Sequence, residues 1–178
     1  MDRAVFCIAD TEMQAAEIVR SLKTAGFPAN DISVLFPDKE GTRDFAHEKN
    51  TKAPEGAAAG AATGGILGGA VGWLVGIGSL AIPGVGPFIA AGPIMAALGG
   101  AALGAATGGL GGALVGMGIP EFEAKRYADR IRSGNILISV HTEDGEERSR
   151  AKEIFERHRA SDIATSGEES VKSRAVGR

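Results

Sequence analysis

Charge is absent from a long central part of this sequence. Residues 56–120 are 65 consecutive positions without Asp, Glu, Lys or Arg, so every charged side chain lies before or after them. The chain therefore divides into a polar N-terminal segment, an uncharged block rich in Gly and Ala, and a polar C-terminal segment. The two polar segments together are long enough to form one small hydrophobic core.

Cysteine and basic clusters are also scarce. The single Cys7 excludes a disulfide framework within one chain, which fits a reducing compartment. The net charge is −3, and neither polar segment carries a basic stripe, which argues against nucleic acid as a partner. The first residues lack a long apolar run before a small-residue cleavage site, so we expect no signal peptide.

Residues that carry chemistry are few and scattered. His47, His141 and His158 lie far apart without the spacing of metal ligands. The glycines between residues 84 and 92 read as turn glycines, because no Lys or Ser/Thr signature of a phosphate loop follows them. We therefore expect no enzymatic activity, no catalytic residue, no cofactor, no metal and no small-molecule substrate.

The polar segments show alternating strand and helix patterns. In the first, an apolar run is followed by a Thr-x-x-Gln capping box at Thr11, which starts a helix that Gly26 ends. In the second, Pro120 suits a first helical position and Gly134 a stop. The predicted strands are 3–10, 31–37, 135–144 and 162–167, and the predicted helices are 11–25, 119–134 and 146–160.

The two polar segments resemble each other in pattern. "FCIADTE" (6–12) matches "ISVHTED" (138–144), and the helix after each has an Ala-x-x-Ile spacing. Two β-α-β halves predict an α+β, ferredoxin-like sandwich that is split by the uncharged block. A four-strand parallel α/β sheet stays open as an alternative, because helix 119–134 precedes the third strand.

The expected organisation has five parts. Residues 1–37 form the first half of the α+β domain, 38–55 a linker, 56–118 a glycine-zipper helical hairpin, 119–167 the second half, and 168–178 a disordered tail. In the hairpin, helices over 57–82 and 94–118 are joined by a Pro/Gly-rich bend at 82–93. Each predicted helix exceeds the roughly 20 residues that cross a bilayer.

Glycine recurs every fourth residue in both predicted helices of the hairpin. This spacing is typical of packed helices in an apolar medium, because small residues let two backbones approach closely. We call the two series of glycines at this spacing the first and second glycine ladders, and together they form the predicted helix-packing interface. The first ladder is Gly56, Gly60, Gly64, Gly68, Gly72 and Gly76, and the second is Gly100, Gly104, Gly108, Gly112 and Gly116.

These patterns predict a self-associating structural protein of the membrane. Basic residues on both flanks of the block place both termini in the cytoplasm of a bacterium, with the 82–93 bend on the outer side of the inner membrane. The expected partners are the lipid bilayer and further copies of the chain. Two alternatives stay open: a soluble scaffold in which hairpins bury one another in a large homo-oligomer, and a regulatory or ligand-binding domain tethered to the membrane.

One segment carries a family resemblance. "GIPEFEAKRYADRIRSGNILISVHTED" (118–144), with "AGFPANDISVLF" (25–36) and the glycine-rich block between them, resembles the bacterial general stress protein 17M-like family. The resemblance implies a small stress-associated protein with a glycine-zipper insert and no catalytic residues. The architecture is also similar to a small membrane subunit of alternative complex III, which lacks the 119–134 helix and has a less glycine-rich hairpin.

Overall fold

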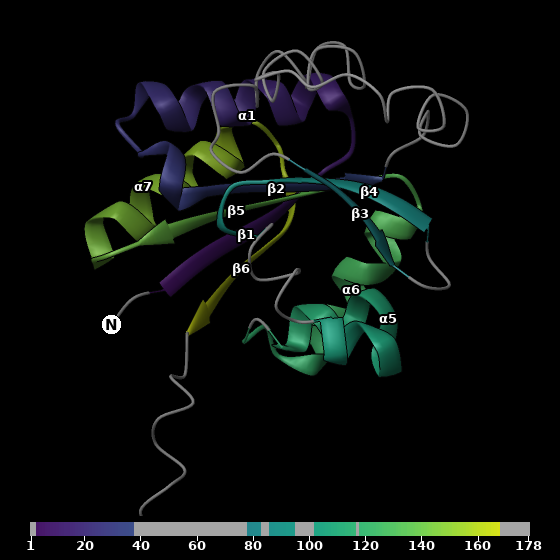
Figure 1. Ribbon diagram of the computed structural model, residues 1–178. Helices are drawn as coiled ribbons and strands as arrows, with labels where there is room; N and C mark the ends of the chain where they lie inside the picture. Colours follow the sequence, from purple (N-terminus) through teal and green to yellow (C-terminus); the bar gives the residue numbers. More distant parts are fainter. Residues whose placement is uncertain (1–2, 38–77, 83–85, 95–101, 117, 168–178) are drawn as a thin grey trace, which may run out of the picture.

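The computed structural model describes residues 3–37, 78–82, 86–94, 102–116 and 118–167, and it shows an α+β fold (Figure 1). Six strands form one sheet in the order β3-β4-β2-β5-β1-β6. They are β1 (Arg3–Ala9), β2 (Ile32–Pro37), β3 (Gly78–Ile82), β4 (Gly86–Ala91), β5 (Ile136–Thr142) and β6 (Ser161–Gly167). The strands predicted in the polar segments are confirmed, with small shifts at their ends.

All neighbouring strands in the sheet are antiparallel. The central pair, β1 and β5, is in register from Arg3 opposite Thr142 to Ala9 opposite Ile136. The alternative of a four-strand parallel sheet is therefore wrong. The physical reason is that each crossover skips a strand: β5 lies between β1 and β2, and β1 lies between β5 and β6.

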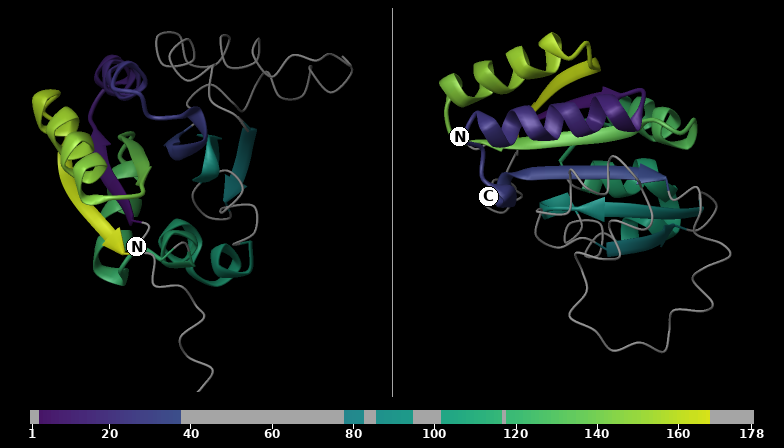
Figure 2. Two further views of the ribbon diagram at one scale, coloured as in Figure 1. Left: turned by 90° about the vertical axis from the view of Figure 1, so that its left-hand side faces the viewer. Right: turned by 90° about the horizontal axis from the view of Figure 1, so that it is seen from above.

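Helices cover both faces of the sheet. Helices α1 (Glu12–Thr24) and α7 (Gly145–Arg157) lie on one face, and α5 (Ala102–Gly116) and α6 (Glu121–Arg132) lie on the other, as Figures 1 and 2 show. A short 3-10 helix, Ala29–Asp31, leads into β2. The helices predicted in the polar segments are thus confirmed, and the uncharged block supplies α5.

The strands alternate their side chains between two buried cores. Val5 and Cys7 of β1 face the core under α1 and α7, whereas Phe6 and Ile8 face the core under α5 and α6. A strand buried on both faces has an almost continuous apolar sequence, which is what the first predicted strand showed. Burial of these side chains supplies the main stabilising term of the fold.

Capping side chains fix where α1 and α7 begin. Thr11 Oγ1 accepts a hydrogen bond from the Gln14 backbone N–H, so the predicted cap at Thr11 is confirmed. The second bond of the box is displaced by one residue, because Gln14 Oε1 accepts from the N–H of Asp10 and not of Thr11. An equivalent box starts α7, where Asp144 Oδ1 caps Glu147 N–H and Glu147 Oε2 accepts from Glu143 N–H. The helix predicted over 146–160 thus begins one residue earlier, at Gly145, and its cap at Asp144 was not among the predicted signals.

The uncharged block contributes two strands in place of the predicted helix end and bend. Residues 78–82, expected to end a helix over 57–82, form β3, and residues 86–91, expected to be a bend, form β4. The helix prediction is wrong for its last five residues, Gly78–Ile82. Short apolar runs have no periodicity that separates a buried strand from a buried helix, so the sequence pattern could not decide between them. Residues 56–77 of the predicted hairpin, the 38–55 linker and the 168–178 tail lie outside the described residues.

A glycine and a serine join β4 to the centre of the sheet. Gly92 has a φ of +84°, and a Cβ atom there would lie 1.9 Å from the carbonyl oxygen of Ile32. The buried Ser33 Oγ accepts a hydrogen bond from the Ile94 backbone N–H at 3.1 Å. Only a residue without a side chain permits this backbone approach, and it brings the end of the β3-β4 hairpin against β2.

Candidate functional site

The described part of the predicted glycine interface lies in α5. Gly104, Gly108, Gly112 and Gly116 belong to this helix. The remaining members of the predicted interface lie outside the described residues: Gly56, Gly60, Gly64, Gly68, Gly72, Gly76 and Gly100.

Helix α5 is interrupted within the ladder. Gly109 has φ 57° and ψ −147°, which are not helical values. Because a straight helix is needed to keep every fourth residue on one face, this break separates Gly104 and Gly108 from Gly112 and Gly116. The expectation of one unbroken helix over 94–118 is therefore wrong at Gly109.

The core-facing side of α5 is formed by larger residues than the ladder glycines. Leu110, Ala113 and Leu114 are buried, whereas Gly112 is half-buried and Gly116 is exposed. The contact with α6 passes instead through Gly111, where a Cβ atom would lie 4.0 Å from the Ala128 Cβ atom. At this end of the second ladder, the glycines face away from the core of the domain.

Two large apolar side chains are exposed where α5 passes into α6. Phe122 near the start of α6 is 77% exposed, and Val115 near the end of α5 is 41% exposed. Gly118, with a φ of +87°, connects the helices. We call Val115, Gly116 and Phe122 the α5–α6 apolar corner. Exposed apolar side chains contribute to surfaces that meet a partner or a membrane where they form a contiguous patch.

The sequence carries a signal for the outward position of Phe122, which lies in the spacing of the apolar residues of its helix. The buried residues of α6 are Ala124, Tyr127, Ala128 and Ile131, at the spacing of one helical face. Phe122 is off that face, so a helical projection of the segment places it toward the outside.

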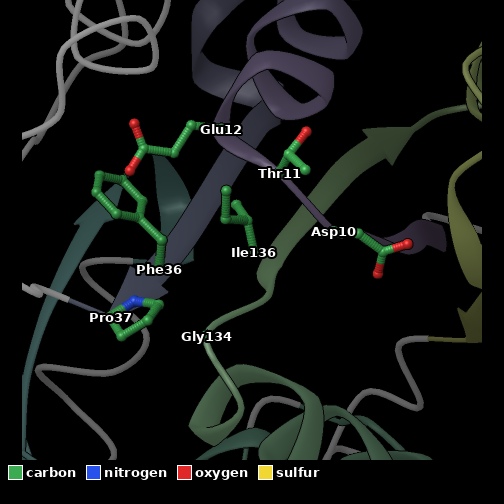
Figure 3. Close-up of a pocket in the computed structure, with 7 residues that line it drawn as sticks. All are labelled: Asp10, Thr11, Glu12, Phe36, Pro37, Gly134 and Ile136. Atoms are coloured by element: carbon green, nitrogen blue, oxygen red, sulfur yellow. The ribbon is translucent and has the colours of Figure 1, made fainter.

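A small hollow lies where β1, β2 and β5 meet the start of α1 (Figure 3). Its lining residues are Asp10, Thr11, Glu12, Phe36, Pro37, Gly134 and Ile136. The Asp10 carboxylate points away from Phe36 and Pro37. The volume is about 40 Å³, which holds a water molecule or two but is far below the roughly 300 Å³ at which small-molecule sites begin.

The Asp10 carboxylate belongs to a polar network that ties α6 to the sheet. Asp10 Oδ1 accepts hydrogen bonds from Asn135 Nδ2 at 2.8 Å and from Arg130 Nη2 at 3.1 Å. Arg130 also pairs with Asp162, where Nε lies 3.3 Å from Oδ2, and Arg126 forms a second ion pair with Asp162. All charges in this network are paired within the chain, which is the arrangement of a structural clamp.

Tyr127 completes the clamp from inside the core. Its hydroxyl donates a hydrogen bond to the Asp162 carbonyl oxygen at 2.9 Å, and its ring centroid lies 6.1 Å from that of Phe6. Burial of the ring, followed by the negative charge of Glu123, raises the pKa of Tyr127 above its ordinary value. The hydroxyl therefore remains a protonated donor at neutral pH.

The other side chains considered for chemistry have structural positions. His158 Nε2 lies 2.7 Å from Ser21 Oγ, which links α7 to α1, and His141 lies on β5. Cys7 is fully buried, and burial raises the pKa of its thiol. Within the described ranges, no group of three His, Cys, Asp or Glu side chains is placed to hold a metal ion. His47 lies outside them.

Comparisons with protein-family models, with curated proteins and with solved structures give no match.

In the part of the chain that the structure describes, no helix has both the length and the apolar character to cross a membrane.

Proposed function

We propose that the chain is a non-enzymatic structural protein that associates with itself and with the inner membrane of a bacterium through its uncharged block. The observation that carries this proposal is the α5–α6 apolar corner, where Val115 and Gly116 are exposed at the end of α5 and Phe122 is exposed near the start of α6. The fold uses the opposite side of α5 for its own core. A partner in an apolar medium would bury the corner and the ladder glycines beside it.

For the fold, we propose a ferredoxin-like core with an insertion. The segments β1-α1-β2 and β5-α7-β6 supply the strand order β2-β5-β1-β6 with α1 and α7 on one face. The strands β3 and β4 extend this core beyond β2, and α5 covers its second face together with α6. This arrangement would explain why the two polar segments carry similar sequence patterns.

The sheet restricts how the block can meet a bilayer. Residues 34–37 of β2 pair with residues 88–91 of β4, so the middle of the block belongs to the same sheet as the two polar segments. The expectation that the 82–93 bend lies across the membrane from those segments is wrong for residues 86–91. The proposed contact is therefore with one side of the membrane, and we place the sheet and both termini on the cytoplasmic side.

The pairing of β4 with β2 also favours a second candidate function. Since part of the uncharged block is built into a folded sheet, copies of the chain could bury their ladder glycines against one another without lipid. Like the proposed membrane protein, this soluble scaffold would associate with itself, but it would not bind a membrane. A role in general stress rests on the resemblance of residues 118–144 and 25–36, with the glycine-rich block between them, to the general stress protein 17M-like family.

Membrane fractionation of the native protein distinguishes the two candidates. The membrane proposal expects the chain to float with vesicles on a density gradient, to remain with them after an alkaline carbonate wash, and to leave them in detergent. Recovery of a vesicle-free species without detergent contradicts that proposal. A large species of this kind supports the scaffold, and a monomer contradicts both.

A further inference from the structure

Strand β6 forms one outer edge of the sheet. It pairs with β1 on its inner side, and none of the other described strands pairs with its outer side. The second outer edge, β3, lies on the opposite side of the molecule (Figure 2). An edge strand presents a row of backbone N–H and C=O groups that can bond to a further strand.

One end of β6 is shaped by a bulge. Ile8 is opposite Ser161 and Phe6 is opposite Ala164, so β6 has one more residue than β1 between these pairs. Asp162 has a φ of +53° there, and its side chain is held by Arg126 and Arg130. Bulges of this kind end regular pairing, which leaves Ala164–Gly167 as the regular part of the edge.

The regular part lacks two of the features that keep edge strands apart. Residues 163–167 contain no charged residue and no proline, the two features that natural proteins commonly place at edges. Ala164 and Thr165 have small side chains and are only half-buried. No charge or bulk would therefore oppose the approach of a second strand.

We propose that β6 pairs antiparallel with β6 of a second copy across a twofold axis. All strand pairs of the sheet are already antiparallel, so a twofold axis beside β6 continues the same sheet through both copies. Residues 163–167 carry no charge that would repel the same residues of the second copy, and each copy supplies the same backbone groups, with which no other described strand pairs. This surface is separate from the α5–α6 apolar corner and does not depend on the proposed membrane contact.

Disulfide cross-linking of the full chain tests the pairing. Single cysteines replace Ala164, Thr165 or Ser166, and the fully buried Cys7 does not compete for oxidant. The matched control is Met13→Cys, which places an exposed thiol on α1. At least one edge variant should form covalent dimer on the order of tenfold faster than the control, because pairing holds the thiols at high effective concentration.

A second substitution separates strand pairing from association elsewhere. In the edge variant that cross-links most, a lysine at a neighbouring edge position (Thr165→Lys, or Ala164→Lys where the cysteine is at 165) brings two like charges together across the axis. The covalent dimer should then be lost, while the circular dichroism spectrum and the membrane fractionation stay unchanged. Equal cross-linking in the edge variants and the control overturns the proposal. A different result is cross-linking of Thr165→Cys chains to Leu80→Cys chains and not to one another. That result would indicate head-to-tail pairing of β6 with β3 and would overturn the proposed twofold axis.

Discussion

Gly92 and Ile32 meet backbone to backbone, so that a Cβ atom on Gly92 would lie 1.9 Å from the Ile32 carbonyl oxygen. This contact is the point at which the uncharged block is fixed to the centre of the sheet. It also shows that the β3-β4 hairpin is an integral part of the domain, because β4 could not pair with β2 if the chain after it were displaced.

Replacement of Gly92 by alanine should therefore weaken the fold strongly. The methyl group would collide with backbone atoms and the residue would keep a positive φ, so we expect a loss of about 3–5 kcal/mol in the free energy of unfolding. Urea denaturation followed by circular dichroism measures it. Gly26→Ala is the matched control, since Gly26 has a φ of +91° but nothing within 4 Å of a Cβ atom. Its cost should be about 1–2 kcal/mol, and equal losses in the two variants would contradict the steric explanation.

A second prediction concerns the end of α7. Arg159 adopts a φ of +56°, and the backbone N–H groups of Arg159 and Ala160 bond to the carbonyls of Glu156 and Phe155. Glycine favours this left-handed position after a helix, whereas an L side chain is strained there. Arg159→Gly should raise the free energy of unfolding by about 0.5–1 kcal/mol.

The control for Arg159→Gly is the same substitution two residues earlier, Arg157→Gly. Arg157 is the last residue of α7, and its ion pair with Glu153 is exposed. Arg157→Gly should lower the free energy of unfolding, by about 1 kcal/mol or less, because glycine is unfavourable within a helix. Thermal melts of the two variants should therefore shift in opposite directions. A lower melting temperature for both would mean that the left-handed geometry of Arg159 carries no strain.

The sequence predicted the positions of helices and strands well wherever capping residues or helix-ending glycines were present. Thr11 and Gln14 identified the start of α1, and Gly134 identified the end of α6, because caps and stops act through hydrogen bonds between near neighbours. These local signals were sufficient to place the strands of both polar segments. The strand order could not follow from them, since it depends on contacts such as Arg3 with Thr142 that lie far apart in the chain.

The uncharged block resisted prediction for a physical reason. In the sequence, Leu80 and Phe88 stand among small apolar residues, a pattern that is equally consistent with a buried strand and with a buried helix. The decisive contact, Gly92 against Ile32, is a tertiary one and leaves no trace in local sequence. Phe122 was a different case. Its position off the buried face of α6 could be predicted from the helical spacing, and only its exposed fraction required the structure.

Tyr127 gives a prediction that depends on pH. Burial raises its pKa in the folded protein above the value of about 10 found in unfolded chains. The folded state therefore favours the neutral phenol, and this contribution to stability is complete below pH 10 and is lost as the pH rises through the folded pKa. Because the chain has one tyrosine, the rise in absorbance at 295 nm that accompanies tyrosinate formation reports this residue, while Trp73 adds a background that does not titrate.

The titration of Tyr127 has a clear expected outcome. Tyrosinate should appear near pH 10 in urea, and only at higher pH in the native protein. Tyr127→Phe should remove the signal and also reduce the loss of stability above pH 10, although it gives up the hydrogen bond to the Asp162 carbonyl. A native titration that coincides with the urea titration would show that the ring is accessible to solvent.

The exposed Phe122 connects the structure to the proposed function. At 77% exposure, its ring contributes little to the core, so Phe122→Ser should change the free energy of unfolding by no more than about 0.5 kcal/mol. In a membrane, by contrast, an aromatic ring at the interface contributes to binding through burial of apolar area. We therefore expect the variant to fold normally while a smaller fraction floats with vesicles.

Met13→Ser provides the control for this last prediction. Met13 is 61% exposed on α1, which covers the face of the sheet opposite α5 and α6. The same loss of apolar surface there should leave vesicle flotation unchanged, because only the α5–α6 apolar corner is proposed to meet the membrane. If both variants float as the unmodified protein does, the corner makes no contact with lipid. If both lose flotation equally, binding depends on general surface hydrophobicity and not on the position of Phe122.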